Sequence, residues 1–168
     1  MAELKIISMD EVQSKQVNWL WYPYIPYGKI TIIQGDPGEG KTTLALRLAA
    51  LLSKGEPLPY DDTEREPVKI IYQTAEDGLE DTIKPEDFTV NEAQILAWTA
   101  ALIAKPRILL VDEFDASIDD KILTTIDTLL EKEFTDSTII MVSHKNRSAL
   151  KFHKKIHMEE SRIQVETC

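Results

Sequence analysis

Short apolar runs alternate along the chain with longer segments in which apolar residues recur at helical spacing. The short runs are rich in β-branched residues and predict buried strands at 29–34, 68–74, 107–111 and 137–142. The longer segments predict helices at 41–54, 91–104 and 119–133. Two further runs, 155–158 and 162–165, flank Glu160-Ser161 and predict a terminal hairpin.

Helix-breaking residues mark the ends of two predicted helices. Gly55 and Pro57 end the first helix, and Pro106 ends the second. The apolar side chains that we expect to face the core from the second and third helices are Ile95, Leu96, Leu102, Ile103, Ile122, Leu123, Ile126, Leu129 and Leu130.

Strands that alternate with helices predict an α/β fold of three layers, a mostly parallel sheet with helices on both faces. Right-handed crossovers place the carboxyl ends of parallel strands at one edge, where such sheets bind ligands. Polar sequences follow three of the strands, at 35–43, 112–119 and 143–144. We therefore expect these three sequences to converge on one site.

Composition narrows the class of protein. The 168 residues have the length of one domain, and 43% of them are hydrophobic. With 29 acidic against 19 basic residues the net charge is −10, which opposes binding to a phosphate backbone. No apolar run reaches the roughly 18 residues of a membrane span, and residues 1–10 lack the pattern of a secretion signal. We expect one cytoplasmic domain over 1–168, with neither a membrane nor nucleic acid as its partner.

The polar sequence after the first strand matches G-x-x-x-x-G-K-[ST], between a strand and a helix as this phosphate-binding loop requires. Its glycines let the backbone turn N–H groups inward as an anion-binding nest, and the following helix adds partial positive charge. The residues expected to hold a nucleoside triphosphate, ATP in first place, are Gly35, Asp36, Pro37, Gly38, Glu39, Gly40, Lys41, Thr42 and Thr43. Lys41 would bind the β- and γ-phosphates, Thr42 would ligate Mg²⁺, and Thr43 would contact the α-phosphate.

Residues after three other strands are candidates for catalysis. The apolar strand before Asp112-Glu113 would hold Asp112 close to Mg²⁺ and leave Glu113 to polarise an attacking water. Glu76 follows the second strand and is an alternative catalytic base at the same edge. His144 follows the fourth strand directly and would reach the γ-phosphate.

Aromatic residues and prolines crowd the segment before the first strand, from Trp19 to Tyr27, and the prolines disfavour a helix there. Two roles suit such a cluster: stacking on an adenine ring, or fastening the N-terminal segment to the core. The sequence leaves both roles open.

Two parts of the chain resemble two families of ATPases. Residues 18–84 resemble a RecA/RepA-type ATPase through Asn18-Trp19-Leu20 and Tyr72-Gln73-Thr74-Ala75-Glu76-Asp77-Gly78. Residues 88–168 resemble the back half of an ABC-transporter nucleotide-binding domain through 105–113, Ala116-Ser117-Ile118-Asp119 and Ser143-His144. The first resemblance implies Glu76 as the catalytic base. The second implies Glu113, with His144 as the switch histidine.

The second part departs from the ABC pattern. The family's Leu-Ser-Gly-Gly-Gln signature is replaced by Phe88-Thr89-Val90-Asn91-Glu92, and Glu92 would bring negative charge near a partner's γ-phosphate. Residues 77–87 leave no room for the helical subdomain that engages membrane subunits. We therefore do not expect transporter subunits as partners, and we expect a monomer or a weak homo-oligomer.

Together the resemblances predict a chimera of two P-loop lineages joined near 84–88, of engineered or natural origin, with a sheet of strand order 5-1-4-3-2. The function that they imply is Mg²⁺-dependent ATP binding with weak ATP hydrolysis. One alternative is a folded chimera that binds nucleotide without turnover. A second is a DNA-stimulated ATPase of the helicase or loader type.

Overall fold

The computed structural model describes residues 17–74, 90–115, 118–143, 150–159 and 162–167. Its strands are β1 (Trp19–Trp21), β2 (Ile25–Pro26), β3 (Ile30–Gly35), β4 (Ile70–Thr74), β5 (Ile108–Asp112), β6 (Thr138–Val142), β7 (Lys154–Glu159) and β8 (Arg162–Thr167). Its helices are α1 (Lys41–Lys54), α2 (Val90–Ala104) and α3 (Asp120–Glu133). The predicted strands and helices are all present.

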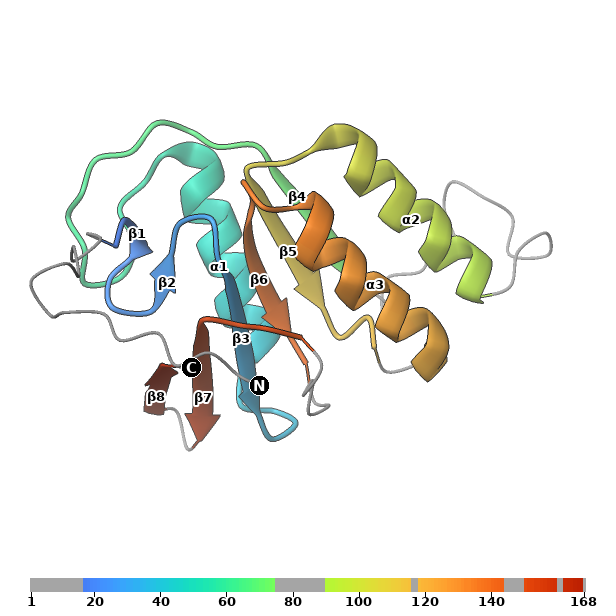
Figure 1. Ribbon diagram of the computed structural model, residues 1–168. Coiled ribbons are helices and arrows are strands. Elements are labelled where there is room, and N and C mark those ends of the chain that lie inside the picture. The colour runs from blue at the N-terminus through green and yellow to red at the C-terminus, as the bar shows by residue number, and fades with distance from the viewer. Residues whose placement is uncertain (1–16, 75–89, 116–117, 144–149, 160–161, 168) are drawn as a thin grey trace, which may run out of the picture.

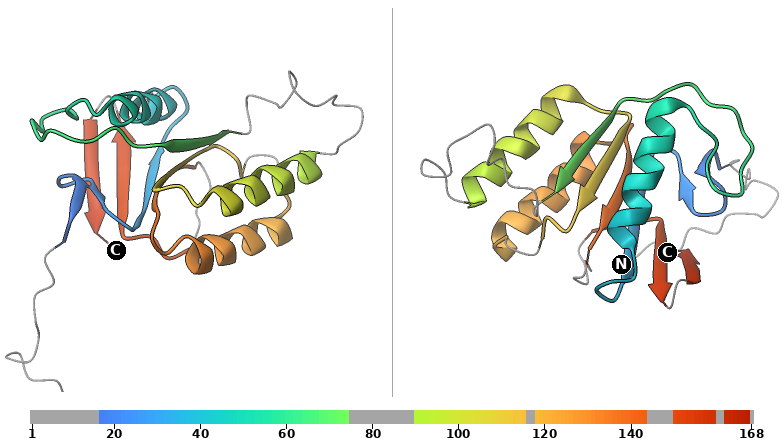
Figure 2. Two further views of the ribbon diagram at one scale, coloured as in Figure 1. Left: turned by 90° about the horizontal axis from the view of Figure 1, so that it is seen from above. Right: turned by 180° about the vertical axis from the view of Figure 1, so that it is seen from behind.

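The main sheet has the order β4-β5-β6-β3-β7-β8, and only the pairing of β7 with β8 is antiparallel. If β3 is counted as the first strand, this is the predicted order 5-1-4-3-2 with a C-terminal hairpin. Helix α1 covers one face of the sheet, and α2 and α3 lie side by side on the other (Figures 1 and 2). The three-layer α/β fold is therefore confirmed.

Neighbouring residues of each central strand point to opposite faces and build two hydrophobic clusters. Ile32 of β3 and Leu109 of β5 belong to the cluster beneath α2 and α3. Ile33 and Leu110, one residue further along, belong to the cluster beneath α1. Because strands buried on both faces need apolar residues at every position, the continuous apolar runs in the sequence follow from this layering.

Two of the residues predicted to face the core from helix α2 are exposed, whereas Leu102 packs against the core as predicted. Ile95 is 53% exposed and Ile103 is 80% exposed, whereas Trp98 and Ala101 are buried. Trp98 packs edge-on against Phe114, with ring centroids 5.3 Å apart. The prediction failed because α2 is apolar nearly all round, so that its sequence marks no single buried stripe. In the described part of the chain, every helix falls short of the length or the apolar character needed to span a bilayer.

The aromatic segment before β3 forms the small antiparallel pair β1–β2. Trp21 is buried in the cluster beneath α1, and its indole N–H donates to the carbonyl of Pro59 at 2.8 Å. The ammonium of Lys154, the first residue of β7, lies 5.4 Å from the centroid of the Trp19 ring. The far end of β7 is the end that pairs with Gly35. This pair of strands therefore sits at the edge opposite residues 35–43, which agrees with the fastening role and not with adenine stacking.

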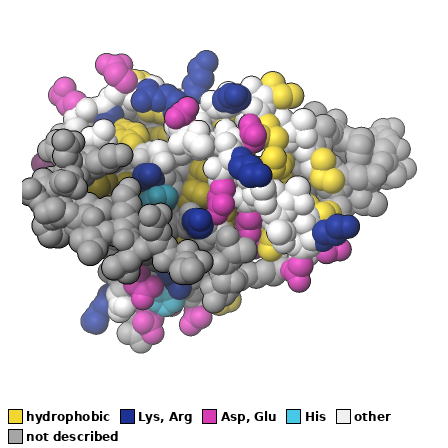
Figure 3. Space-filling view, in the orientation of Figure 1, with side chains coloured by type: hydrophobic (Ala, Val, Ile, Leu, Met, Phe, Trp, Pro, Cys, Tyr) yellow, Lys and Arg dark blue, Asp and Glu magenta, His cyan; other side chains and the backbone are white. Residues whose placement is uncertain are grey.

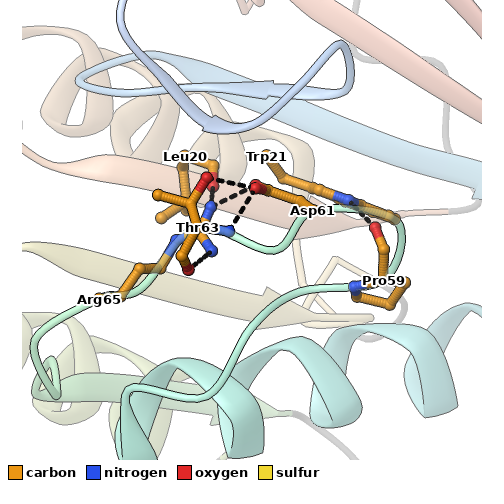
Figure 4. A network of polar contacts seen from close by, with 6 residues as sticks. All are labelled: Leu20, Trp21, Pro59, Asp61, Thr63 and Arg65. Carbon is orange, nitrogen blue, oxygen red and sulfur yellow. Dashed lines mark hydrogen bonds and ion pairs between the residues drawn. The ribbon is translucent and has the colours of Figure 1, made fainter.

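A polar network ties the loop after α1 to β1 (Figure 4). The Asp61 carboxylate accepts hydrogen bonds from the hydroxyl and the backbone N–H of Thr63 and pairs with the guanidinium of Arg65. Arg65 also donates to the carbonyl of Leu20 at 2.9 Å. The hydrogen bond from the Thr63 hydroxyl, helped by Arg65, holds the pKa of Asp61 below its usual value. The network thus fixes the loop through an ionised carboxylate.

Candidate active site

The loop between β3 and α1 is shaped to receive an anion. Gly38 and Gly40 have φ values of 87° and 82°, and a Cβ added at either position would meet no atom of the described residues within 4 Å. These glycines are therefore required by the backbone path and not by crowding from the protein. The N-cap residue of α1 is Gly40, which has no side chain to cap the helix, and the first turn of α1 holds no acidic residue. The first N–H groups of α1 therefore keep their attraction for negative charge.

Gly35 meets a different constraint at the base of the loop. It pairs with Met158 of β7, and an added Cβ would overlap the backbone carbonyl of Met158. Only a residue without a side chain lets β3 and β7 approach at this point. Gly35 therefore sets the starting position of the loop.

Lys41 supplies the positive charge of the site. Its side chain is buried, and its ammonium donates to the carbonyl of Asp36 at 2.9 Å, across the loop. Among the ion pairs of the described residues, none includes Lys41. The charge therefore remains for a ligand at the loop, because no carboxylate of the described residues neutralises it.

Thr42 and Asp112 meet although 70 residues separate them in the sequence. The Thr42 hydroxyl donates to Oδ1 of Asp112 at 3.2 Å, and Asp112 is only 2% exposed. Hydroxyl and carboxylate oxygens are the donors that Mg²⁺ prefers. The described residues contain no group of three or more His, Cys, Asp or Glu side chains that could hold a metal. This small donor set fits Mg²⁺, which keeps several waters and takes further oxygens from phosphates.

Tyr72 belongs to the site, and sequence reasoning missed its part in it. Its hydroxyl donates to Oδ2 of Asp112 at 2.8 Å. Tyr72 lies on β4, whose register with β5 cannot be obtained from the sequence of either strand alone. The alternation of side chains along β4 could have identified its face but not its partner.

Glu113 is held by the end of β6. Its backbone N–H donates to the carbonyl of Val142 at 3.0 Å, and its φ of 48° is unusual for a residue with a side chain. Two residues on, the buried Asp115 accepts a 2.5 Å hydrogen bond from the buried hydroxyl of Ser143. Ser143 in turn donates its backbone N–H to Ile33 of β3. The segments after β3, β5 and β6 therefore meet at one edge, as the sequence predicted.

Two candidate catalytic residues, Glu76 and His144, lie outside the described residues. The same holds for Ala116 and Ser117, and for the side chain of Glu92. Their predicted roles stay predictions.

Comparison with protein families identifies the first half of the chain. Residues 3–86 match the family described as an AAA domain. An uncharacterized ABC transporter ATP-binding protein of Haemophilus influenzae is 27% identical over 83% of this chain and 29% of its own length. ABC transporter C family member 12 of Dictyostelium discoideum is 26% identical over 55% of this chain and 7% of its own length. The chain thus spans less than a third of either relative.

Solved structures support the fold. The dimeric structure of the bacterial ABC transporter cassette MJ0796 has a TM-score of 0.63 and 18% identity, over 85% of this chain and 87% of that one. A post-hydrolysis dimer of the same cassette, bound to ADP and Pi, has a TM-score of 0.62 at 16% identity and the same coverage. At these identities the likeness concerns the fold alone.

These comparisons overturn the expectation about partners. The expectation that transporter subunits are not partners is wrong, because the relatives are ABC transporter proteins and the similar structures are dimeric cassettes. The prediction relied on the missing helical subdomain and the altered signature. Those features describe residues 77–92, whereas the similarity to cassettes extends over most of the chain.

Proposed function

Since the chain belongs to the AAA domain family, we propose that it is an Mg²⁺-dependent ATP-binding domain with slow ATP hydrolysis. The observation that carries the proposal is the contact of Thr42 with Asp112, beside the buried ammonium of Lys41. The Lys41 ammonium, the Thr42 and Asp112 oxygens and the N-terminus of α1 lie together at the carboxyl edge of the sheet. This is the edge at which α/β proteins bind phosphates.

Each part of the site has a task in this proposal. The N–H groups of residues 35–43 bind the phosphate oxygens, and Lys41 binds the β- and γ-phosphates. Mg²⁺, when bound, neutralises charge on those phosphates, and Thr42 and Asp112 are the residues that would hold it. Glu113 or Glu76 polarises the attacking water, and His144 contacts the γ-phosphate.

Hydrolysis is proposed to be slow for two reasons, one at Glu113 and one in the stabilisation of the transition state. Glu113 is fixed through its backbone, but its unusual φ constrains the direction of its side chain. ATPases of this type reach high rates when an arginine from a neighbouring subunit stabilises the transition state.

We further propose that 1–168 acts as one domain that joins two P-loop lineages near 84–88. The observation behind this proposal is that the AAA domain match ends at residue 86, beside the proposed join, whereas the similarity to the ABC transporter protein of Haemophilus influenzae extends over 83% of the chain. By analogy with those relatives, partners would be a second cassette or a transporter subunit.

The first alternative, nucleotide binding without turnover, is favoured by Glu92 at the position of the ABC signature. The second alternative, a DNA-stimulated ATPase, has less support. Acidic and basic side chains are interspersed on the face seen in Figure 3, and its described part shows no single basic surface. A net charge of −10 opposes DNA further.

Calorimetric titration with Mg-ATP, Mg-GTP and ADP, with phosphate release measured in parallel, tests the proposal. We expect tight binding of Mg-ATP and slow phosphate release that single-stranded DNA does not raise. Retention of full affinity and turnover by Lys41→Ala would refute the proposed site. Binding without any phosphate release would support the first alternative instead.

A further inference from the structure

The carboxylate of Asp112 is held on both of its oxygens. Oδ1 accepts from the Thr42 hydroxyl at 3.2 Å and Oδ2 accepts from the Tyr72 hydroxyl at 2.8 Å. Thr42 is the second residue of helix α1 and Tyr72 lies in strand β4, so the two donors approach from separate elements. Only Thr42 belongs to the phosphate-binding loop motif.

The sheet fixes the position of Tyr72. In the parallel pairing of β4 with β5, Tyr72 stands opposite Leu110, and Asp112 is two residues further along β5. Side chains two apart on a strand share a face, so Leu110 and Asp112 both point toward α1. Tyr72 packs against the same cluster beneath α1 that contains Leu110. Its ring is therefore held in the core while its hydroxyl reaches the carboxylate.

Burial makes this contact important for the carboxylate. Asp112 is 2% exposed, and a buried carboxylate must obtain its hydrogen bonds from fixed protein groups because water is excluded. The Thr42 hydroxyl is also a proposed ligand of Mg²⁺, so Mg²⁺ would compete with Oδ1 of Asp112 for this hydroxyl. The Tyr72 hydroxyl donates to the other oxygen, Oδ2, and is not among the proposed ligands of Mg²⁺.

We propose that Tyr72 is a positioning residue for the metal: it holds Oδ2 so that Oδ1 stays directed toward Thr42 and toward Mg²⁺. This inference rests on the proposed Mg-nucleotide function and adds to it a residue outside the motifs. Groups that hydrogen-bond to metal-binding carboxylates orient them, and their loss weakens metal binding while nucleotide contacts remain.

The test compares ADP binding in Mg²⁺ and in EDTA for the unaltered protein, for Tyr72→Phe and for Tyr60→Phe. Tyr72→Phe keeps the ring and removes only the hydroxyl. Tyr60 is fully exposed, so Tyr60→Phe is the same change at a site away from Asp112. Titration of Mg²⁺ at fixed ADP gives the Mg²⁺ concentration for half-maximal tightening, and Mn²⁺ binding followed by electron paramagnetic resonance gives metal affinity directly.

We expect Tyr72→Phe to raise the half-maximal Mg²⁺ concentration and the Mn²⁺ dissociation constant by about tenfold. Affinity for ADP in EDTA should be unchanged, and Tyr60→Phe should behave like the unaltered protein. Unchanged metal affinity in Tyr72→Phe would overturn the inference while leaving the proposed function intact. Equal losses in Mg²⁺ and in EDTA, with a lowered unfolding midpoint, would also overturn it by showing a purely structural contact. If the unaltered protein bound no ADP at all, the proposed function and this inference would both be refuted.

Discussion

The backbone N–H of Glu113 and the carbonyl of Val142 are joined by a 3.0 Å hydrogen bond, which fixes the residue after β5 to the last residue of β6. The bond uses only backbone atoms, so the Glu113 side chain can be changed without removing it. Glu113 can therefore be altered chemically while its position is retained.

Replacement of Glu113 by Gln should abolish most phosphate release and leave ATP affinity nearly unchanged. The amide keeps the size of the side chain but cannot polarise water as a carboxylate does. General base catalysis contributes roughly 10²–10⁴-fold, so a large fall is expected if Glu113 is the base. Phosphate release from Glu113→Gln and Glu76→Gln, measured side by side, identifies the base. A fall in Glu76→Gln alone would transfer the role to Glu76.

Lys41→Ala should weaken ATP binding by about ten- to a hundredfold, the value of one hydrogen bond to a charged group. Arg47→Ala is the matched control, because Arg47 lies on the same helix and is exposed. It removes the same formal charge without touching the loop. Isothermal titration with Mg-ATP measures both variants, and an equal effect of the two would indicate a general electrostatic contribution.

Gly35→Ala should mainly lower the stability of the fold, whereas Gly38→Ala should mainly weaken ATP binding. An Ala at 35 would overlap the Met158 carbonyl, and we expect a loss of about 3 kcal/mol in the free energy of unfolding. An Ala at 38 has space, so only its positive φ opposes it, at about 1 kcal/mol. Urea unfolding measures which variant loses more stability. Titration with ATP should show that Gly38→Ala binds ATP more weakly although it is folded. Equal stability of the two variants would contradict the close approach of β3 and β7.

Asp61 should make stability depend on pH at the acidic end. Its folded pKa lies below the usual value near 3.9, so its contribution is complete above about pH 4 and is lost as pH falls through the folded pKa. Asp61→Asn should therefore be less stable at neutral pH, by about 1–2 kcal/mol, with the difference narrowing under acid. Urea unfolding at several pH values measures the difference in stability between the unaltered protein and Asp61→Asn. Asp62→Asn is the control, because Asp62 is the exposed neighbour. A difference that does not vary with pH would exclude the ionised form as the stabilising one.

The sequence predicted what depends on local patterns. Helix α1 runs over residues 41–54 as expected, because Gly40 precedes it and Gly55, with a φ of 72°, ends it. The strand order followed from topology, since right-handed crossovers leave few arrangements for alternating strands and helices. The convergence of Thr42 and Asp112 followed from the same rule.

The sequence could not predict what depends on contacts between distant segments. The buried face of α2 is chosen by Phe114, against which Trp98 packs, and an evenly apolar helix carries no sign of that choice. The bond between Tyr72 and Asp112 depends on the register of β4 against β5. The prediction about partners was wrong because the departure from the ABC pattern is confined to residues 77–92, whereas the similarity to cassettes extends over most of the chain.

The order of strands in the sheet has a consequence for synthesis on the ribosome. Within the described sheet, β3 is bonded only to β6 and β7, and β4 only to β5, so neither strand from the first 74 residues has a neighbour from that part of the chain. A nascent chain must emerge beyond residue 142 before β3 gains its first neighbour. Until then its isoleucines and unpaired backbone are open to other chains. We therefore expect a chain that ends before residue 138 to leave β3 unpaired and prone to aggregation.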